Sequence, residues 1–252
     1  MTDWFAGKLA VVTGGGSGMG RELVRQLAAR GCSVATCDLY PDTAAATAAL
    51  AQDAAAGAGV LVTSHTCDVS DEAQVLRFRD ELLQAHAASH LDLVFSNAGI
   101  GGGESFVSGR RQDWERVFAK TSAPTHPMSA RRSSCRGTSA PASSGTRCAP
   151  AAIPKLEQLN QAQLEELLPA ALWPEGASVE DMRQFLVRAS EDFRDKAAVS
   201  AAQAAGIILD GVQAGSWRIL IGDDARLIDT FVRTNPESAY DYAELGKMAA
   251  EA

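Results

Sequence analysis

Short apolar runs alternate with longer amphipathic segments along the first hundred residues of the chain. An apolar run of four to eight residues is typical of a buried strand, whereas apolar residues spaced i, i+3, i+4 indicate one face of a helix. Because neighbouring parallel strands need helical crossovers, the alternation predicts an α/β fold with a doubly wound parallel sheet. The predicted strands are 8–13, 32–38, 60–69 and 91–99, and the predicted helices are 20–31, 41–57 and 71–87.

The regular pattern breaks in the middle of the chain and then resumes. A helix that opens at 113–119 stops at Lys120, and amphipathic segments return near Ile153. Ser178 and Asp181 form a capping pair at the start of one of them. The predicted later elements are helices over 154–168, 178–193 and 200–215, a last strand over 217–222 and a polar, helical tail. One face of the helix over 178–193, with Met182, Phe185 and Phe193, is either a substrate lid or plain core packing.

Residues 120–150 differ sharply from both flanks. The segment has no Asp or Glu and none of Val, Ile, Leu, Phe, Tyr or Trp, while Ser, Thr, Pro, Ala and Arg fill most of it. A segment so poor in large apolar residues cannot build a core, and we predict it to be disordered. We therefore expect a single domain over 1–252 whose sheet is incomplete in its second half. Its parts are a nucleotide-binding half (1–119), an irregular segment (120–150) and C-terminal helices with the last strand (151–252).

Composition narrows the class of protein without naming it. The chain has 252 residues, is 46% hydrophobic and carries a formal net charge of −8, which suits one α/β domain and argues against nucleic acid or an anionic membrane as partner. An odd count of five cysteines without a C-x-x-C pair makes a disulfide framework or zinc site improbable. His86 and His90 have the i, i+4 spacing of a metal pair but are better explained as a solvated helix end, so we assign no metal site. With no leader or membrane span visible, we expect a cytoplasmic protein.

A glycine cluster between the first strand and first helix is the most informative motif. Residues 13–20 read T-G-x-x-x-G-x-G, with glycines at Gly14, Gly18 and Gly20. A dinucleotide pyrophosphate needs such a turn, because the backbone must approach the phosphates closely and helix N–H groups must point at them. The predicted pyrophosphate-binding residues are Gly14, Gly16, Ser17, Gly18, Met19 and Gly20.

An acid at the end of the second strand bears on the choice of cofactor. Asp38 follows the glycine turn at the distance at which a carboxylate can accept hydrogen bonds from the adenosine ribose. The same charge would repel a 2′-phosphate, which favours NAD over NADP. The alternative is that Asp38 is a strand-end or helix-capping acid.

These motifs, followed by "CDV" at 67–69 and "NAG" at 97–99, resemble those of the short-chain dehydrogenase/reductase family. The resemblance runs to about residue 119 and resumes near residue 153. It implies a Rossmann-like fold and NAD-dependent hydride transfer between an alcohol and a ketone or aldehyde. It also places Asp68 and Val69 beside the adenine and adds further cofactor-binding residues, namely Leu39, Asn97, Ala98 and Gly99.

The proton-transfer residues that this family uses are missing. The resemblance implies a Y-x-x-x-K pair on one helix, because an unperturbed tyrosine with a pKa of about 10 is a poor base at neutral pH without a nearby cation. The three tyrosines are Tyr40, Tyr240 and Tyr242, and none has a lysine four places on. We therefore assign no catalytic residue. Two functions stay open: an oxidoreductase with impaired turnover of a small alcohol or carbonyl, or a non-catalytic NAD(H)-binding or interaction protein.

Two origins of residues 120–150 remain open. One is a Ser/Pro-rich insertion that replaces the catalytic segment, and the other is a shifted reading frame with a deletion, or a mispredicted splice. The sharp edges and the Ala, Arg, Pro, Ser and Thr content favour the gene-level accident. We expect the first half to fold as a unit, and the second half to dock loosely or to pair its strand beside 91–99. The resemblance also implies dimers or tetramers, which members of the family often form, so a homo-oligomer stays an open alternative.

Overall fold

The computed structural model describes residues 3–55, 57, 59–99, 160–161, 164, 176–195 and 197–238. The chain separates into two compact units, Met1–Arg132 with Ala201–Ala252, and Ser133–Ser200. The segment 120–150, the helix predicted over 113–119 and most of the one predicted over 154–168 lie outside the described residues. The single-domain division stays a prediction.

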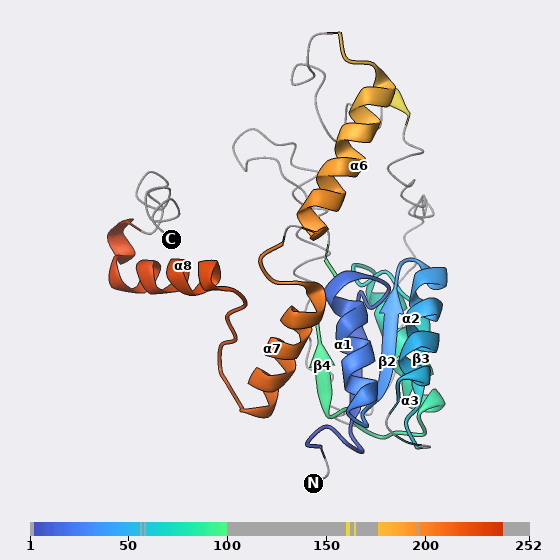
Figure 1. Cartoon of the computed structure of the whole chain (residues 1–252). Helices are drawn as coiled ribbons and strands as arrows, with labels where there is room; N and C mark the ends of the chain where they lie inside the picture. Colours follow the sequence, from blue (N-terminus) through green and yellow to red (C-terminus); the bar gives the residue numbers. More distant parts are fainter. Residues whose placement is uncertain are drawn as a thin grey trace, which may run out of the picture. The chain divides into compact units, whose positions relative to one another are not determined.

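Four parallel strands form the sheet of the first unit (Figure 1). The order is β3-β2-β1-β4, with Val11 opposite Ala35 on one side and opposite Val94 on the other. The predicted doubly wound parallel sheet is therefore confirmed for the described residues. The strands are β1 (Leu9–Thr13), β2 (Ser33–Asp38), β3 (Val62–Thr66) and β4 (Leu93–Phe95). β3 and β4 are shorter than predicted, since residues 67–71 and 96–99 leave the sheet to form turns and loops.

Helices cover both faces of this sheet because its side chains alternate between the faces. Ala10 and Val12 pack with α1 (Gly18–Ala29) and α7 (Ala201–Gln213), whereas Val11 packs with α3 (Glu72–Ala85) on the opposite face. The remaining helix of the first half, α2 (Pro41–Asp53), lies beside α1 and adds Ala51 to the same core.

Helix α7, from the second half of the chain, completes the core of the first half and lies beside α1 in Figure 1. Ala205 and Leu209 are fully buried against α1 and the sheet. Two polar contacts anchor the same face: Gln26 Nε2 donates to the Ala202 carbonyl at 2.8 Å, and Arg30 Nη1 lies 3.3 Å from Asp210 Oδ1. The expectation that the second half docks loosely is therefore wrong for α7, because its buried residues share one core with α1 and the sheet.

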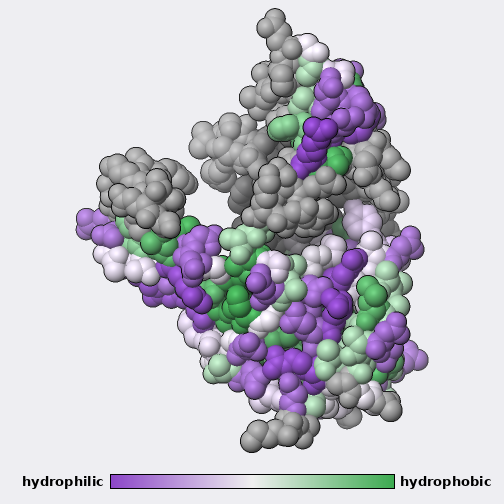
Figure 2. Space-filling model, in the orientation of Figure 1, coloured by the Kyte–Doolittle hydropathy of each residue, from purple (hydrophilic) through white to green (hydrophobic). Residues whose placement is uncertain are grey.

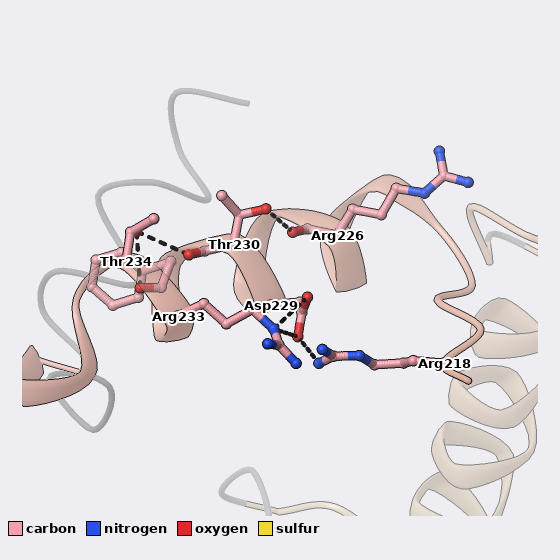
Figure 3. Close-up of polar contacts among 7 residues, drawn as sticks. Arg218, Arg226, Asp229, Thr230, Arg233 and Thr234 are labelled. Carbon is pink, nitrogen blue, oxygen red and sulfur yellow. Dashed lines mark hydrogen bonds and ion pairs between the residues drawn. The ribbon is translucent and has the colours of Figure 1, made fainter. Parts of the chain in front are cut away.

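The prediction of a last strand over 217–222 is wrong. These residues form no regular element, and among the described residues β4 pairs only with β1. Local contacts with helices replace sheet pairing. Arg218 forms an ion pair with Asp229 of α8 (Asp223–Thr234), and Arg233 Nε donates to the same carboxylate at 3.2 Å (Figure 3). The Ile219 side chain packs on α7 at Gly211, where an added Cβ would lie 2.6 Å from it.

The remaining helices agree with the sequence pattern. In the second unit, α6 (Val179–Asp195) starts with the predicted capping pair, since Asp181 N–H donates to Ser178 Oγ at 3.2 Å and Ser178 N–H donates to Asp181 Oδ2 at 2.8 Å. On the predicted face of α6, Met182 is buried but Phe185 is 56% exposed. The helical tail is confirmed as far as it is described, by α8 and the 3₁₀ turn Pro236–Ser238.

The surface of the described residues is mixed in character. Figure 2 shows hydrophilic and hydrophobic residues interspersed over this face. Within the described ranges, none of the helices combines the length and the apolar character that a membrane crossing requires.

Candidate functional site

The glycine turn between β1 and α1 is tight and is anchored to the end of β2. The N–H groups of Gly14 and Gly15 both donate to the Cys37 carbonyl, at 2.8 and 3.2 Å. Gly14 has a φ of +66° and lies so close to the next loop that an added Cβ would sit 2.7 Å from Ala98 Cα. A Cβ on Gly20 would lie 2.1 Å from the Gly14 carbonyl oxygen. Only glycine fits both positions, which accounts for the spacing of the motif.

The tip of this turn presents the start of α1 to solvent. Ser17, Gly18 and Met19 are exposed, and Gly18 has a φ of +53° with open space where a side chain would be. Ser17 is the N-cap, yet its side chain makes no capping hydrogen bond. The first N–H groups of a helix have no intrahelical partner and carry a partial positive charge. This end of α1 can therefore accept an anionic group.

Asp38, the last residue of β2, lies against the turn. Gly16 N–H donates to Asp38 Oδ2 at 2.9 Å, and Tyr40 N–H donates to Asp38 Oδ1 at 3.2 Å. Each oxygen of an ionised carboxylate can accept a second hydrogen bond. The half-buried Asp38 is thus oriented by the backbone and retains acceptor capacity for hydroxyl groups of a ligand.

The segment after β3 joins the same edge of the sheet. Cys67 N–H donates to the Asp38 carbonyl at 3.1 Å, which brings Asp68 and Val69 next to the end of β2. Asp68 Oδ1 accepts from Ser70 N–H at 3.0 Å and from Ser70 Oγ at 2.6 Å. Val69 is half-buried against the core under α3. The turn that Asp68 closes ends the strand and fixes the position of both residues.

The loop after β4 supports the turn from the other side. Asn97 Nδ2 donates to the carbonyl oxygens of Thr13 and Gly14, at 3.0 and 3.2 Å. The N–H groups of Asn97 and Ala98 donate to Thr13 Oγ1, at 3.1 and 3.0 Å. Asn97 and Ala98 therefore position the glycine turn through these hydrogen bonds. Sequence reasoning did not single out Thr13 as a site residue, although it is the first letter of the motif.

The pKa is raised for two of the buried thiols, while a hydrogen bond with Cys37 lowers the pKa of the third, Cys67. The three described cysteines, Cys32, Cys37 and Cys67, are free and buried. Hydrogen bonding with Cys67 and burial raise the pKa of the Cys37 thiol. Burial raises the pKa of Cys32 to about 12. These two cysteines act as small apolar packing residues, Cys37 near the carboxyl end of β2 and Cys32 just before its start.

Known proteins with similar sequences identify the family. A family model described as short chain dehydrogenase matches residues 8–129. The "Putative oxidoreductase SadH" of Mycobacterium tuberculosis is 30% identical over 258 residues, which cover 91% of this chain and 91% of the relative. The chain belongs to the short-chain dehydrogenase/reductase family. It is an oxidoreductase family, and the chain is similar to this relative over nearly its whole length.

Solved structures of the family resemble part of this short-chain dehydrogenase/reductase. An NAD⁺-bound xylitol dehydrogenase is 27% identical, with 47% of this chain and 44% of that chain covered and a TM-score of 0.43. A metagenomic short-chain oxidoreductase in complex with NADP is 28% identical, with 45% and 49% covered and a TM-score of 0.40. The first of these structures holds NAD⁺ and the second NADP.

In this family member, the predicted cofactor residues gather at the carboxyl ends of the four strands. The glycine turn follows β1, Asp38 ends β2 and Leu39 comes directly after it. Asp68 and Val69 follow β3, and Asn97, Ala98 and Gly99 follow β4. Tyr40 is the N-cap of α2, and Tyr240 and Tyr242 lie outside the described residues. The part of the chain that is described holds no group of three metal-ligating side chains.

Proposed function

We propose that this chain binds NAD along the carboxyl edge of its sheet. The observation that carries the proposal is the Asp38 carboxylate, held by two backbone N–H groups beside the exposed start of α1. In this assignment Asp38 accepts hydrogen bonds from the adenosine ribose, while the N–H groups of residues 17–20 receive the pyrophosphate. Asp68, Val69 and Leu39 border the adenosine end, and Asn97, Ala98 and Gly99 lie along the cofactor. The close packing at Gly14 and Gly20 fits such a cradle, because side chains there would block it.

Charge supports NAD over NADP. A 2′-phosphate would lie near the Asp38 carboxylate, and two unit charges about 4 Å apart repel by roughly 4 kcal/mol at an effective dielectric constant of about 20. The ribose hydroxyls of NAD gain hydrogen bonds to the same oxygens instead.

The reaction that we infer is hydride transfer between a small alcohol and the corresponding ketone or aldehyde, for which bound NAD supplies the hydride acceptor. Proton transfer at the substrate oxygen is the step this chain performs poorly, because its sequence has no tyrosine followed four places on by a lysine. That observation also favours the second candidate, a non-catalytic NAD(H)-binding protein. The free thiols of the described cysteines support a cytoplasmic location.

A fluorescence titration with NADH tests the binding proposal. Replacing Asp38 by alanine removes charge-assisted hydrogen bonds worth about 1.5–3 kcal/mol each, so the Kd for NADH should rise at least about tenfold. The matched control is Asp42→Ala, which removes the same charge from an exposed position on α2 and should leave the Kd unchanged. A wild-type chain that leaves NADH fluorescence unaltered would contradict the proposal.

An absorbance assay with NAD and a panel of secondary alcohols tests turnover separately. We expect no NADH production above the enzyme-free rate from a preparation that binds NADH in the titration. Steady, protein-dependent NADH production would show that proton transfer does not require the missing pair, and would overturn the impaired-turnover proposal.

A further inference from the structure

Two side chains outside the glycine motif donate hydrogen bonds to the carbonyl oxygen of Gly16. Arg21 Nη2, from α1, donates to this oxygen at 2.6 Å. Thr47 Oγ1, from α2, donates to it at 3.4 Å. The two side chains also contact each other, since Arg21 Nε donates to Thr47 Oγ1 at 3.1 Å. Thr47 is fully buried, so its hydroxyl sits in this network and not in solvent.

The hydrogen bonds from Arg21 and Thr47 affect Asp38 through the backbone of Gly16. This residue has its carbonyl held by Arg21 and Thr47 and its N–H bonded to Asp38 Oδ2 at 2.9 Å. As a glycine it has no side chain to fix its orientation, and there is no room for one, since an added Cβ would lie 2.4 Å from Thr43 Oγ1. A glycine is the residue with the greatest backbone freedom, so its direction depends on such outside contacts. Arg21 and Thr47 supply them.

The other oxygen of Asp38 is held from the first turn of α2. Tyr40 N–H donates to Asp38 Oδ1, and Thr43 Oγ1 donates to the Tyr40 carbonyl at 3.0 Å. The carboxylate is therefore fixed at both oxygens, once through α1 and α2 together and once through α2. A fixed carboxylate accepts ribose hydroxyls without first losing rotational freedom, which strengthens binding.

We propose that Arg21 and Thr47 are positioning residues that strengthen the preference of this chain for NAD. They hold Gly16 so that its N–H keeps Asp38 turned toward the ribose. The inference rests on the proposed NAD site. When the hydrogen bonds of Arg21 and Thr47 to Gly16 are lost, Asp38 keeps its charge and still repels a 2′-phosphate. Its carboxylate is then no longer held in one orientation for accepting hydrogen bonds from the ribose hydroxyls. NADH binding should weaken more than NADPH binding.

A merely structural role makes a different prediction. Arg21 and Thr47 also join α1 to α2, so their loss could lower the melting temperature alone. In that case the affinities for NADH and NADPH would change by the same factor. The ratio of the two dissociation constants separates the two roles.

The test titrates four variants with NADH and with NADPH by fluorescence and records each melting temperature. Thr47→Val removes the hydroxyl at nearly constant shape, and Thr47→Ser keeps it. Arg21→Gln removes the guanidinium, while Arg25→Gln makes the same change one turn along α1, where Arg25 pairs only with Glu22 among the contacts of the described residues. Loss of a hydrogen bond of about 1 kcal/mol should raise the Kd for NADH about fivefold in Thr47→Val and in Arg21→Gln.

The Kd for NADPH should change less than the Kd for NADH in those two variants, so the NADPH/NADH ratio falls. Thr47→Ser and Arg25→Gln should keep the wild-type ratio. An unchanged ratio in both Thr47→Val and Arg21→Gln, with wild type still binding NADH, overturns this inference alone. A wild-type chain that binds neither nucleotide overturns the proposed function and the inference with it.

Discussion

Single polar residues fasten the ends of the strands to one another. The Asn97 side-chain amide bridges two carbonyl groups of the glycine turn, and the Thr13 hydroxyl receives two N–H groups of the β4 loop. Asn97 and the glycines could be predicted because they belong to a spaced motif. Thr47 could not, because a threonine within an alanine-rich helix looks like any other helical residue until the fold brings it to Gly16.

A pair of histidines at the edge of the sheet gives a pH-dependent term in stability. His86 Nε2 lies 2.9 Å from Thr63 Oγ1, which also contacts His65 Nε2 at 3.1 Å, and His65 Nδ1 lies 3.2 Å from Glu81 Oε2. Burial and the neighbouring His65 lower the pKa of His86 below its ordinary value of about 6.5. A folded-state pKa below the unfolded one means that the unfolded chain binds the proton more readily. His86 therefore stabilises the fold above about pH 6.5, and this contribution is lost as the pH falls through the folded pKa.

We predict that lowering the pH from about 7.5 to about 5.5 reduces the free energy of unfolding less in His86→Gln than in the wild type. Urea unfolding at both pH values measures the difference. His90→Gln is the control for the loss of a histidine at the surface, because the His90 side chain is 72% exposed. Equal pH slopes for His86→Gln and wild type would count against the assignment.

At the scale of elements, amphipathic pattern predicts helices well and does not predict isolated strands. The patterns of α1, α2, α3 and α7 gave the correct element types, because a helix closes its hydrogen bonds within itself. Residues 217–222 have a strand-like pattern but no strand, because a strand needs a neighbour to pair with. Their side chains contact α7 and α8 instead.

Docking of α7 should contribute strongly to the stability of the first unit. Leu209 is fully buried between α1 and the sheet, so Leu209→Ala should lower the free energy of unfolding by about 2–5 kcal/mol. Ile228→Ala on α8, where the side chain is 51% exposed, should change it by less than about 1 kcal/mol. Chemical unfolding followed by circular dichroism measures both. Similar, small losses in the two variants would mean that α7 is not part of the cooperative core.

At the scale of the whole molecule, the match to a relative extends across nearly the full chain, while the sequence has no tyrosine followed four places on by a lysine. These two facts fit a parent enzyme whose catalytic segment has been replaced at residues 120–150. The proposed NAD site is built from residues before that segment, so we expect NADH binding even without turnover.

Sequencing the coding DNA and the transcript between the codons for Ala119 and Ile153 tests this history. We expect another frame, or a skipped stretch, to encode an asparagine soon after Ala119, an apolar strand ending in serine and a Y-x-x-x-K helix. Restoring that segment should restore NAD-dependent alcohol oxidation in the absorbance assay. A sound reading frame with no such residues in any frame would make residues 120–150 genuine and favour the non-catalytic binder.

The sequence by itself determined the parallel α/β pattern, the glycine turn, the acid after the second strand and the family. Each of these depends on residues close together in the chain, where hydrophobic period and motif spacing carry the information. Only the tertiary structure decided that α7 completes the core of the first half, that residues 217–222 form no strand, and that Arg21 and Thr47 meet at Gly16. These outcomes depend on which distant surfaces become neighbours, and no local spacing in the sequence records that choice.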